Sequence, residues 1–321
     1  MSWKRSVITY NENLLLNTLK LQQELKNGTY KPGKLIPIEV FEPRRRTVLS
    51  SRYRDRQVQR VLITQYLYHE ITKRFIHDNH AGQANKGTKT ARKRMKIMLE
   101  KAHRQWGTDY YVHTFDIKSF FQSTGHDVAK QAIKENVTDA WATSLIHQFI
   151  DAFENGIGLG SEIGQLTELT VLNRLDHIVK ERLGAKLYLR YMDDFIIIHQ
   201  DKEYLKQCEE VIIHELAKMK LQLNAKKSKL IPMRKDFKWL GFMYHQTDAG
   251  KIIITLPKTK IINERRKLKR LVRAAKAGKI TKETVNNSFL CWQNHASYGN
   301  NYNTIKHMKT YYKKLWRDNN D

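Results

Sequence analysis

The sequence has little cysteine and little proline. It contains two cysteines, Cys208 and Cys291, in 321 residues, which are too few for a disulfide framework or a zinc pattern. This usage favours a reducing compartment, and we expect a cytoplasmic protein. The five prolines are scattered and no low-complexity stretch is present, so we expect no flexible linker and predict that the parts pack as one body.

Long apolar runs are also missing. Runs such as residues 252–256 are far shorter than the roughly 20 apolar residues that a membrane-spanning helix requires. Near the N-terminus, Lys4 and Arg5 are not followed by the apolar stretch of a signal peptide. We therefore expect neither a membrane partner nor a secretory leader.

Acidic residues are scarce relative to basic ones. The chain has 58 Lys and Arg against 32 Asp and Glu, a net charge of +26, which argues for a polyanionic partner. One basic cluster has Asp55 as its single acid, and a second, over residues 258–279, has only Glu264. A solvated helix face is one explanation, but charges of one sign are costly to gather unless an anion binds, so we favour phosphate binding. The first cluster contains Arg44, Arg45, Arg46, Arg52, Arg54, Arg56 and Arg60.

Two adjacent carboxylates, Asp193 and Asp194, lie within an apolar frame at residues 188–199. Strand-forming residues on both sides place the pair at the turn of a hairpin. An Asp-rich turn explains such a pair, and so does a metal site. Asp116 ends another predicted strand, where an acid is unfavourable unless it is hydrogen-bonded, paired or metal-bound.

The remaining pattern indicates an α+β chain. Residues 155–161 form a glycine-rich bend that allows close approach of the backbone to a ligand. Gly87-Thr88 fits phosphate binding at a helix start, or an ordinary glycine turn with an N-cap. We predict helices at residues 11–26, 128–153, 162–183, 202–220 and 258–279 and from about residue 92, with strands at 35–41 and 110–116 and hairpins at 188–199 and 239–254.

In order along the chain, these pieces resemble a reverse transcriptase. Compact bacterial and phage enzymes of this family, of the diversity-generating retroelement type and the related defence-associated type, are the most similar. The resemblance covers nearly the whole sequence, and the collinear order is far more specific than any one motif. The matching elements are Arg54-Asp55-Arg56-Gln57-Val58-Gln59, Lys86-Gly87-Thr88, Phe115-Asp116-Ile117-Lys118-Ser119-Phe120-Phe121, the bend at 156–165 and Tyr191-Met192-Asp193-Asp194.

The resemblance implies a right-hand polymerase fold and a two-metal mechanism. The fingers would span residues 1–105, the palm 106–256 and a small helical thumb 257–321. Two Mg²⁺ ions, for which Mn²⁺ is a substitute, would be held by carboxylates and one carbonyl. The implied metal ligands are Asp116, Ile117, Asp193 and Asp194.

The resemblance also assigns the other site residues. Lys227 matches the lysine that protonates pyrophosphate, Phe121 the steric gate that selects deoxynucleotides, and Gln165 the glutamine beside the incoming nucleotide. Arg44, Arg46 and Arg56 would contact the triphosphate or template. The implied nucleic-acid contacts are Lys86, Lys89, Trp239 and Gly241 of a primer-grip-like turn, and Arg265, Arg266, Lys269 and Arg273 of the thumb.

The expected function is RNA-directed DNA synthesis on a dedicated non-coding RNA in antiviral defence. The partners would be that RNA, its cDNA, deoxynucleoside triphosphates and an accessory or effector protein. Mutagenic cDNA synthesis in a diversity-generating retroelement is the alternative, although Gly158 and Gly164 replace a proline and a serine of that group's bend. A non-catalytic RNA-binding scaffold is an alternative of another class.

Overall fold

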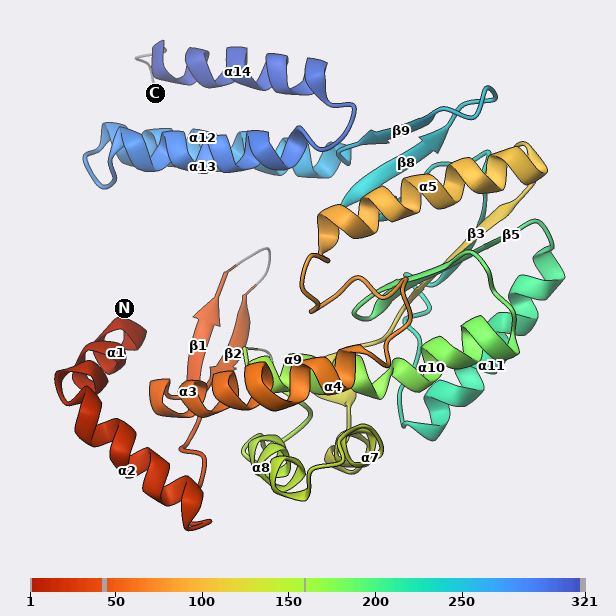
Figure 1. The fold of residues 1–321 in the computed structure, drawn as a ribbon. Helices are drawn as coiled ribbons and strands as arrows, with labels where there is room; N and C mark the ends of the chain where they lie inside the picture. The colour runs from red at the N-terminus through yellow and green to blue at the C-terminus, as the bar shows by residue number, and fades with distance from the viewer. Residues whose placement is uncertain (1, 42–44, 159, 318–321) are drawn as a thin grey trace. The chain divides into compact units, whose positions relative to one another are not determined.

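A computed structural model describes residues 2–41, 45–158 and 160–317. The chain divides into two units, each built from separate stretches of sequence and each described by itself below. The first contains Met1–Gly87, Phe115–Ile197 and Glu203–Lys229, and the second contains Thr88–Thr114, Ile198–Lys202 and Leu230–Asp321. Figure 1 labels their helices and strands.

The N-terminal part of the first unit consists of helices and one antiparallel hairpin. The predicted helix at residues 11–26 is confirmed over Leu14–Lys26, and it is followed by Gly28, whose φ of +68° favours glycine. The predicted strand at 35–41 pairs with a second strand in the register Ile36↔Ser50. The elements are α1 (Ser2–Glu12), α2 (Leu14–Lys26), β1 (Ile36–Val40), β2 (Arg46–Ser50), α3 (Tyr53–Leu62), the π-helical segment η1 (Ile63–Leu67) and α4 (Tyr68–Thr72).

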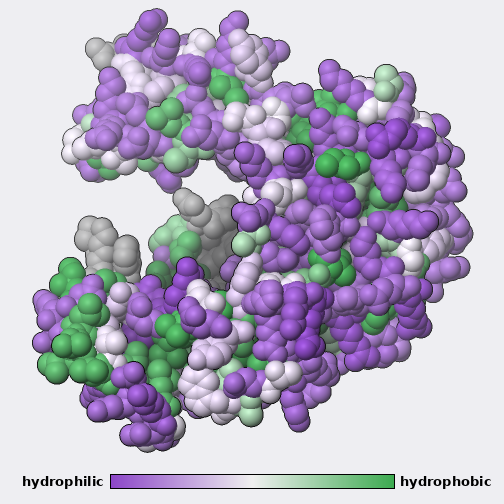
Figure 2. All heavy atoms as spheres, in the orientation of Figure 1, coloured by the Kyte–Doolittle hydropathy of each residue, from purple (hydrophilic) through white to green (hydrophobic). Residues whose placement is uncertain are grey.

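Hydrophobic side chains gather on the surface over these N-terminal helices (Figure 2). In α2 Leu21 is buried, whereas four other leucines are exposed, Leu15 by 72%. Helix α2 therefore presents an apolar face to solvent. The other three exposed leucines are Leu14, Leu16 and Leu19.

A four-stranded sheet carries the predicted acids. Its order is β4-β5-β3-β6, and β4 and β5 form the predicted hairpin, with Tyr191 opposite Asp194. The rings of Phe115 and Phe195 stack with centroids 4.9 Å apart. Aromatic packing thus ties the two strands that lead to the acids. The strands are β3 (Tyr111–Asp116), β4 (Tyr188–Tyr191), β5 (Asp194–His199) and β6 (Lys229–Pro232).

Two predicted helices of the first unit are broken into shorter ones. The predicted helix at 128–153 is interrupted because the Asp139 carboxylate accepts a hydrogen bond from the Ala142 N–H at 2.7 Å and starts a new helix. The predicted helix at 162–183 divides at Leu172. The elements are α6 (Phe120–Ser123), α7 (His126–Asn136), α8 (Ala140–Asp151), α9 (Glu162–Val171), α10 (Asn173–His177), the π-helical η2 (Ile178–Arg182) and α11 (Lys202–Lys218).

The second unit combines one long helix, a three-stranded meander and three C-terminal helices. The predicted hairpin at 239–254 is confirmed as β8 and β9, and an additional strand, β7, pairs with β8 in the order β7-β8-β9. The C-terminal helices enclose a core of Leu268, Phe289 and Met308. The elements are α5 (Thr88–Trp106), β7 (Phe237–Trp239), β8 (Phe242–Gln246), β9 (Ile252–Thr255), α12 (Lys258–Lys276), α13 (Lys282–Ala296) and α14 (Tyr302–Arg317).

Candidate active site

The two adjacent acids lie at the tight turn between β4 and β5, as predicted. Met192 has a φ of +56°, a backbone conformation that residues other than Gly, Asn and Asp rarely adopt. Such strain of roughly 1–3 kcal/mol persists only where the surroundings impose it, and it is common at functional sites. The surroundings must therefore hold this turn in place.

Arg190 supplies that support from beneath the turn. Its guanidinium is fully buried and donates two hydrogen bonds to the Asp176 carboxylate, at 2.7 and 2.6 Å, and one to the Met192 carbonyl at 3.1 Å. The Tyr188 hydroxyl donates to the same Asp176 carboxylate at 2.7 Å. A buried ion pair of α10 and β4 thus fixes the backbone one residue before Asp193.

Asp116 is the last residue of β3, and the irregular segment that contains residues 222–224 runs beside the end of this strand. The Asn224 N–H donates to the Asp116 carbonyl at 2.7 Å, and the Lys118 N–H donates to the Gln222 carbonyl at 2.9 Å. These backbone bonds bring the side chains of the lysine-rich stretch that follows α11 to the Asp116 carboxylate.

The Asp116 side chain is bonded on both oxygens. Asn224 Nδ2 donates to Oδ1 at 3.0 Å, and Lys227 Nζ donates to Oδ2 at 2.6 Å. The Asp116 N–H also donates to Ser228 Oγ at 3.4 Å. A buried carboxylate is tolerated here because it is both hydrogen-bonded and paired with a cation.

The electrostatics link the acids of the two strands. Burial raises the pKa of Asp193 above its ordinary value, and the nearby Asp116 carboxylate raises it further, against the opposing charges of Lys227 and Arg190. Burial lowers the pKa of Lys227, but the hydrogen bond and charge of Asp116 outweigh it and the net pKa is raised. Lys227 is therefore an ammonium at neutral pH.

The donor chemistry fits a hard divalent cation. Carboxylate oxygens are the ligands that Mg²⁺ prefers, and the raised pKa of Asp193 reflects a site that an added positive charge would stabilise. Within residues 2–41, 45–158 and 160–317, however, no three His, Cys, Asp or Glu side chains form a group that could hold a metal ion. The nearest counter-charge to Asp116 is the Lys227 ammonium.

A further acid, absent from the predicted set, lies near Asp193. Glu168 of α9 is fully buried, and the Thr124 hydroxyl donates to its Oε2 at 2.9 Å. In the described part of the chain its Oε1 has no hydrogen-bond partner. Burial raises the pKa of Glu168 well above its ordinary range, and the charge of Asp193 adds to the rise. Burial and the nearby Asp193 charge therefore both favour the protonated form of Glu168.

The glycine-rich bend packs directly on the segment that carries Phe121. A Cβ at Gly156 would lie 2.4 Å from the Phe121 carbonyl oxygen, and the Ile157 N–H donates to that oxygen at 2.6 Å. Only glycine fits this contact. The bend leads into α9, where Gln165 is exposed, so the structure brings the Phe121 segment and the start of the Gln165 helix together.

A buried glutamine of the Arg-Asp-Arg element anchors the bend. Ser161 Oγ donates to Gln59 Oε1 at 3.1 Å and accepts from the Gly164 N–H at 3.1 Å, capping α9. Gln59 Nε2 donates to Ser51 Oγ at 2.9 Å. Helix α3 thus fixes the N-terminus of the helix that carries Gln165.

We predict that Ser161→Ala lowers the free energy of unfolding by about 2 kcal/mol, because it removes the N-cap and leaves the buried Gln59 carbonyl oxygen without its donor. The matched control is Thr281→Ala, which removes a cap of the same geometry from the exposed start of α13 and should cost about 0.5–1 kcal/mol. Urea unfolding measures both changes. Equal losses would contradict a supporting role for the Gln59–Ser161 bond.

The arginine cluster was expected to lack acidic partners, and this is wrong for three of its members. Arg45 pairs with Glu39 at 2.7 Å, Arg54 with Glu24, and Arg60 with Glu162 at 3.4 Å. The acids come from other elements, so the local count of charges missed them. Arg44 lies outside the described residues, and for Arg46 only the backbone is described.

Arg56 differs from its neighbours. Its guanidinium stacks over the Tyr53 ring at 5.6 Å, and among the described residues its buried Nε has no hydrogen-bond partner. The adjacent Asp55 is structural, since it accepts from the Tyr30 hydroxyl at 2.8 Å and from the Gly33 N–H at 3.1 Å. Arg56 therefore remains the cluster's best candidate for an anionic ligand.

Lys86 is tied to its own loop. Its ammonium donates to the carbonyls of His77 and Asn79 at 2.8 and 3.0 Å and to Gln83 Oε1 at 3.1 Å. Burial lowers its pKa. Lys86 thus holds the turn of the Lys-Gly-Thr element, whereas Lys89 is exposed on α5.

The primer-grip-like turn joins β7 and β8 in the second unit. Trp239 is buried, and Leu240 and Gly241 both have positive φ. Arg92 of α5 donates two hydrogen bonds to the Leu240 carbonyl, at 3.2 and 3.0 Å, and lies over the Phe242 ring at 4.6 Å. Helix α5 thus holds the turn in a defined shape.

Helix α12 confirms the predicted basic helix at residues 258–279 and presents a cationic face. Its interior contacts come from Leu268 and Val272. All four predicted nucleic-acid contacts on this helix are exposed, namely Arg265, Arg266, Lys269 and Arg273.

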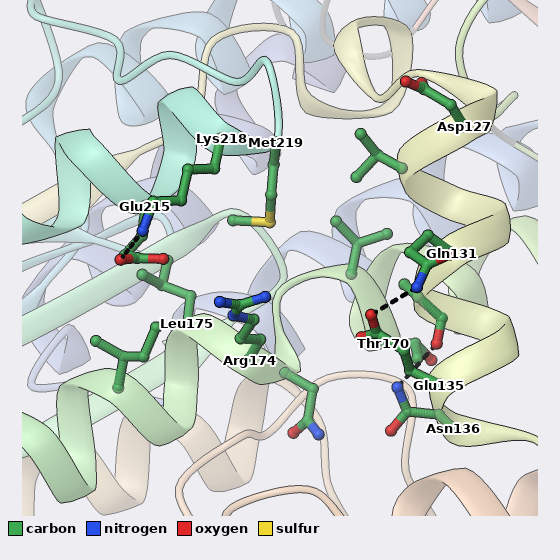
Figure 3. A pocket seen from close by; sticks show the side chains of 15 residues that line it. Asp127, Gln131, Glu135, Asn136, Thr170, Arg174, Leu175, Glu215, Lys218 and Met219 are labelled. Carbon is green, nitrogen blue, oxygen red and sulfur yellow. Dashed lines mark hydrogen bonds and ion pairs between the residues drawn. The ribbon is translucent and has the colours of Figure 1, made fainter.

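The first unit also has a cavity of about 600 Å³, away from the predicted site. Figure 3 shows Arg174 projecting between Gln131 of α7 and Lys218 of α11, with Lys218 paired to Glu215. No predicted site residue lines it. The cavity is connected to the predicted site through α10, which forms one of its walls and also carries Asp176, the partner of Arg190.

Sequence reasoning missed Asn224, Glu168, Asp176 and Arg190. Arg190 had a usable signal, because it interrupts an apolar strand and buried charges are normally paired. Asp176 had none, because the residues around it in α10 are mostly polar. Asn224 and Glu168 have no such local signal, since their partners lie far away in sequence.

Comparisons with known proteins agree with this geometry. Residues 44–244 match the family model "Reverse transcriptase (RNA-dependent DNA polymerase)". No curated protein matches the sequence. In the part of the chain that the structure describes, no helix is long and apolar enough to cross a membrane.

Two solved telomerase structures share the fold. One is the complex of Candida albicans telomerase with the TWJ fragment of telomeric RNA, with a TM-score of 0.56, 11% identity and coverage of 90% of this chain and 55% of that one. The other is apo telomerase from Candida tropicalis truncated from its C-terminal domain. It has a TM-score of 0.51 and 14% identity, and the match covers 74% of this chain and 59% of that one. This chain thus spans little more than half their length. The predicted α+β right-hand polymerase fold is confirmed, and the chain belongs to the reverse transcriptase family.

Proposed function

We propose that this protein is an RNA-directed DNA polymerase that joins deoxynucleotides by metal-dependent nucleotidyl transfer. The observation that carries the proposal is that Asp116 ends β3 and Asp193 directly precedes the neighbouring strand β5, with Lys227 bonded to Asp116. Family membership supports it. The RNA in the Candida albicans telomerase structure supports RNA as the partner nucleic acid.

Each proposed residue has a distinct task. Asp116, Asp193, Asp194 and the Ile117 carbonyl would hold two Mg²⁺ ions, which supply activation of the primer 3′-hydroxyl and charge neutralisation at the triphosphate. Lys227, an ammonium at neutral pH, donates a proton toward the leaving pyrophosphate. We propose that the three arginines Arg44, Arg46 and Arg56 bind triphosphate or template.

We propose the remaining roles from the family resemblance. Phe121, fixed by the bend, excludes a ribose 2′-hydroxyl, and Gln165 lies beside the incoming base. Contacts with template or primer come from Trp239, Gly241, Lys86 and Lys89. The exposed cations of α12 bind the phosphate backbone of the nucleic acid. We retain the proposed division into fingers (1–105), palm (106–256) and thumb (257–321).

A primer-extension assay tests the function. With an RNA template, an annealed DNA primer and Mg²⁺, we expect extension with deoxynucleoside triphosphates, much less with ribonucleoside triphosphates, and none after chelation of divalent ions. RNA binding without extension under any divalent ion would favour the non-catalytic scaffold instead.

We propose a dedicated non-coding RNA as the template and antiviral defence as the role. A Cβ at Gly158 would lie 1.9 Å from the Phe153 ring, so the proline of the diversity-generating pattern would require that ring to move. This supports the defence role over mutagenic cDNA synthesis. Sequencing of co-purified nucleic acid should show one discrete RNA with faithful cDNA, whereas cDNA altered at template adenines would favour the diversity-generating role.

A further inference from the structure

A basic groove in the second unit is separate from every residue given a role above except Lys89. It has a volume of about 400 Å³, and four lysines line it, three from α5 and one from the β8–β9 turn. We call it the α5–β9 groove. The lysines are Lys89, Lys93, Lys96 and Lys251.

One wall of the groove is a straight line of cations. Lys89, Lys93 and Lys96 lie three or four residues apart and therefore share one face of α5, over about 10 Å at 1.5 Å per residue. The opposite face of the helix is buried through Met98 and Ala102. The exposed lysines are thus held in place by a helix that cannot rotate.

The β8–β9 turn brings the fourth lysine to this helix. Gly250, with φ of +80°, approaches α5 so closely that a Cβ there would lie 2.3 Å from the His103 ring. The Thr247 hydroxyl accepts from the Lys251 N–H at 3.1 Å, and the Thr247 N–H donates to the Lys251 carbonyl at 3.0 Å. Lys251 therefore has a fixed place beside α5.

The other wall is the loop between α13 and α14, which is fastened to β9. The Asn300 side chain accepts from the Ile254 N–H at 2.9 Å, and the buried Asn301 side chain accepts from the Leu256 N–H at 2.9 Å. A Cβ at Gly299 would lie 2.3 Å from the Ile254 carbonyl oxygen. Both walls are thus preformed.

The charge of the groove is not balanced. Lys96 pairs with Glu100 at 3.7 Å, but among the described residues no acid pairs with Lys89, Lys93 or Lys251. Preformed walls and an unbalanced row of ammonium groups suit a chain of regularly spaced anions. A phosphodiester backbone is such a chain, and RNA is the polyanion of the proposed function.

The groove is distinct from the primer-grip-like turn. That turn enters β8 at Phe242, whereas Lys251 follows the other end of β8 at Gln246. In a meander, successive turns lie at opposite ends of the shared strand. The Lys251 end of the groove therefore lies away from the turn, while Tyr298 at its other side packs on Phe242 with ring centroids 5.4 Å apart.

We propose that the α5–β9 groove binds the phosphate backbone of RNA outside the catalytic centre, and so holds the template RNA by a segment that is not being copied. This inference rests on the proposed function for its choice of polyanion. It does not rest on catalysis, because the groove contains none of the acids.

The test compares two triple variants of equal net charge. One is Lys93→Gln/Lys96→Gln/Lys251→Gln, which spares Lys89, and the other replaces Lys20, Lys186 and Lys202, three exposed lysines elsewhere in the chain, by Gln. Affinity for a fluorescent single-stranded RNA is measured by anisotropy across a range of salt concentrations. Both variants are also made with Asp193→Asn, so binding is read without synthesis.

Each lost phosphate contact lowers the slope of log affinity against log salt by about 0.7. The groove variant should therefore lose about 2 in slope and about 100-fold in affinity at 0.1 M salt relative to 1 M, and the control variant less than about a quarter of that slope. Equal slopes for the two variants overturn the proposal. So does an equal loss of binding to polyglutamate, which would make the groove a general anion site. Absence of primer extension by the wild-type chain would count against the polymerase and leave the slope comparison valid.

Discussion

Replacement of Asp193 by Asn should abolish primer extension, with a loss of at least about 1000-fold, or roughly 4 kcal/mol in the barrier. The amide keeps the shape of the side chain but removes the anionic oxygen required to hold a divalent ion beside Asp116. Single-nucleotide incorporation under saturating Mg²⁺ measures the loss.

The same variant should be at least as stable as the wild type. Burial raises the pKa of Asp193 in the folded chain above that in the unfolded chain. As pH rises through the ordinary pKa of Asp, the unfolded chain therefore loses this proton before the folded chain does, and folding becomes less favourable. The cost grows as pH rises from the ordinary pKa of Asp to the raised pKa of folded Asp193, and Asn removes it. Thermal unfolding at pH 7 should show an equal or higher midpoint.

Asp109→Asn is the matched control, because Asp109 is exposed just before β3. It should leave both extension and stability unchanged. An inactive Asp193 variant with a lower midpoint would mean that unfolding, and not lost chemistry, explains the result. Full activity of that variant would exclude Asp193 from the catalytic centre.

Replacement of Arg190 by Met should lower the free energy of unfolding by about 3–5 kcal/mol, because the Asp176 carboxylate is then buried without its cation. Extension should fall as well, since the Met192 carbonyl loses its donor and the strained turn before Asp193 is released. Urea unfolding at constant m-value gives the stability change.

Two further variants separate the two effects. Asp176→Asn in the Arg190→Met background neutralises the orphaned charge and should recover part of the stability but none of the activity. Arg182→Met removes an exposed arginine 4.0 Å from Glu215 and should change stability by less than about 0.5 kcal/mol. A loss below 1 kcal/mol for Arg190→Met would contradict the supporting role of the buried pair.

The sequence was sufficient for features encoded by neighbouring residues. The hairpin with Asp193 at its turn and the acid at the end of β3 follow from short apolar runs that alternate with turn residues. The helix at residues 128–153 was predicted without its break because the Asp139 cap acts through a single side-chain bond.

Features that depend on distant partners could not be predicted in this way. Lys227 reaches Asp116 across 111 residues, and Lys86 binds carbonyls of its own loop that a charge count does not reveal. The arginine cluster seemed uncompensated because its acids, such as Glu162, are far away in sequence. Charge density along a chain thus indicates a polyanionic partner but not which cations remain available to it.

The ammonium of Lys227 is attached to the same polypeptide as the acids it faces. Its positive charge is therefore present from the moment this part of the chain is synthesised, whatever salts surround it. The segment around Asp116 can therefore fold with this buried carboxylate already paired, before any other cation binds.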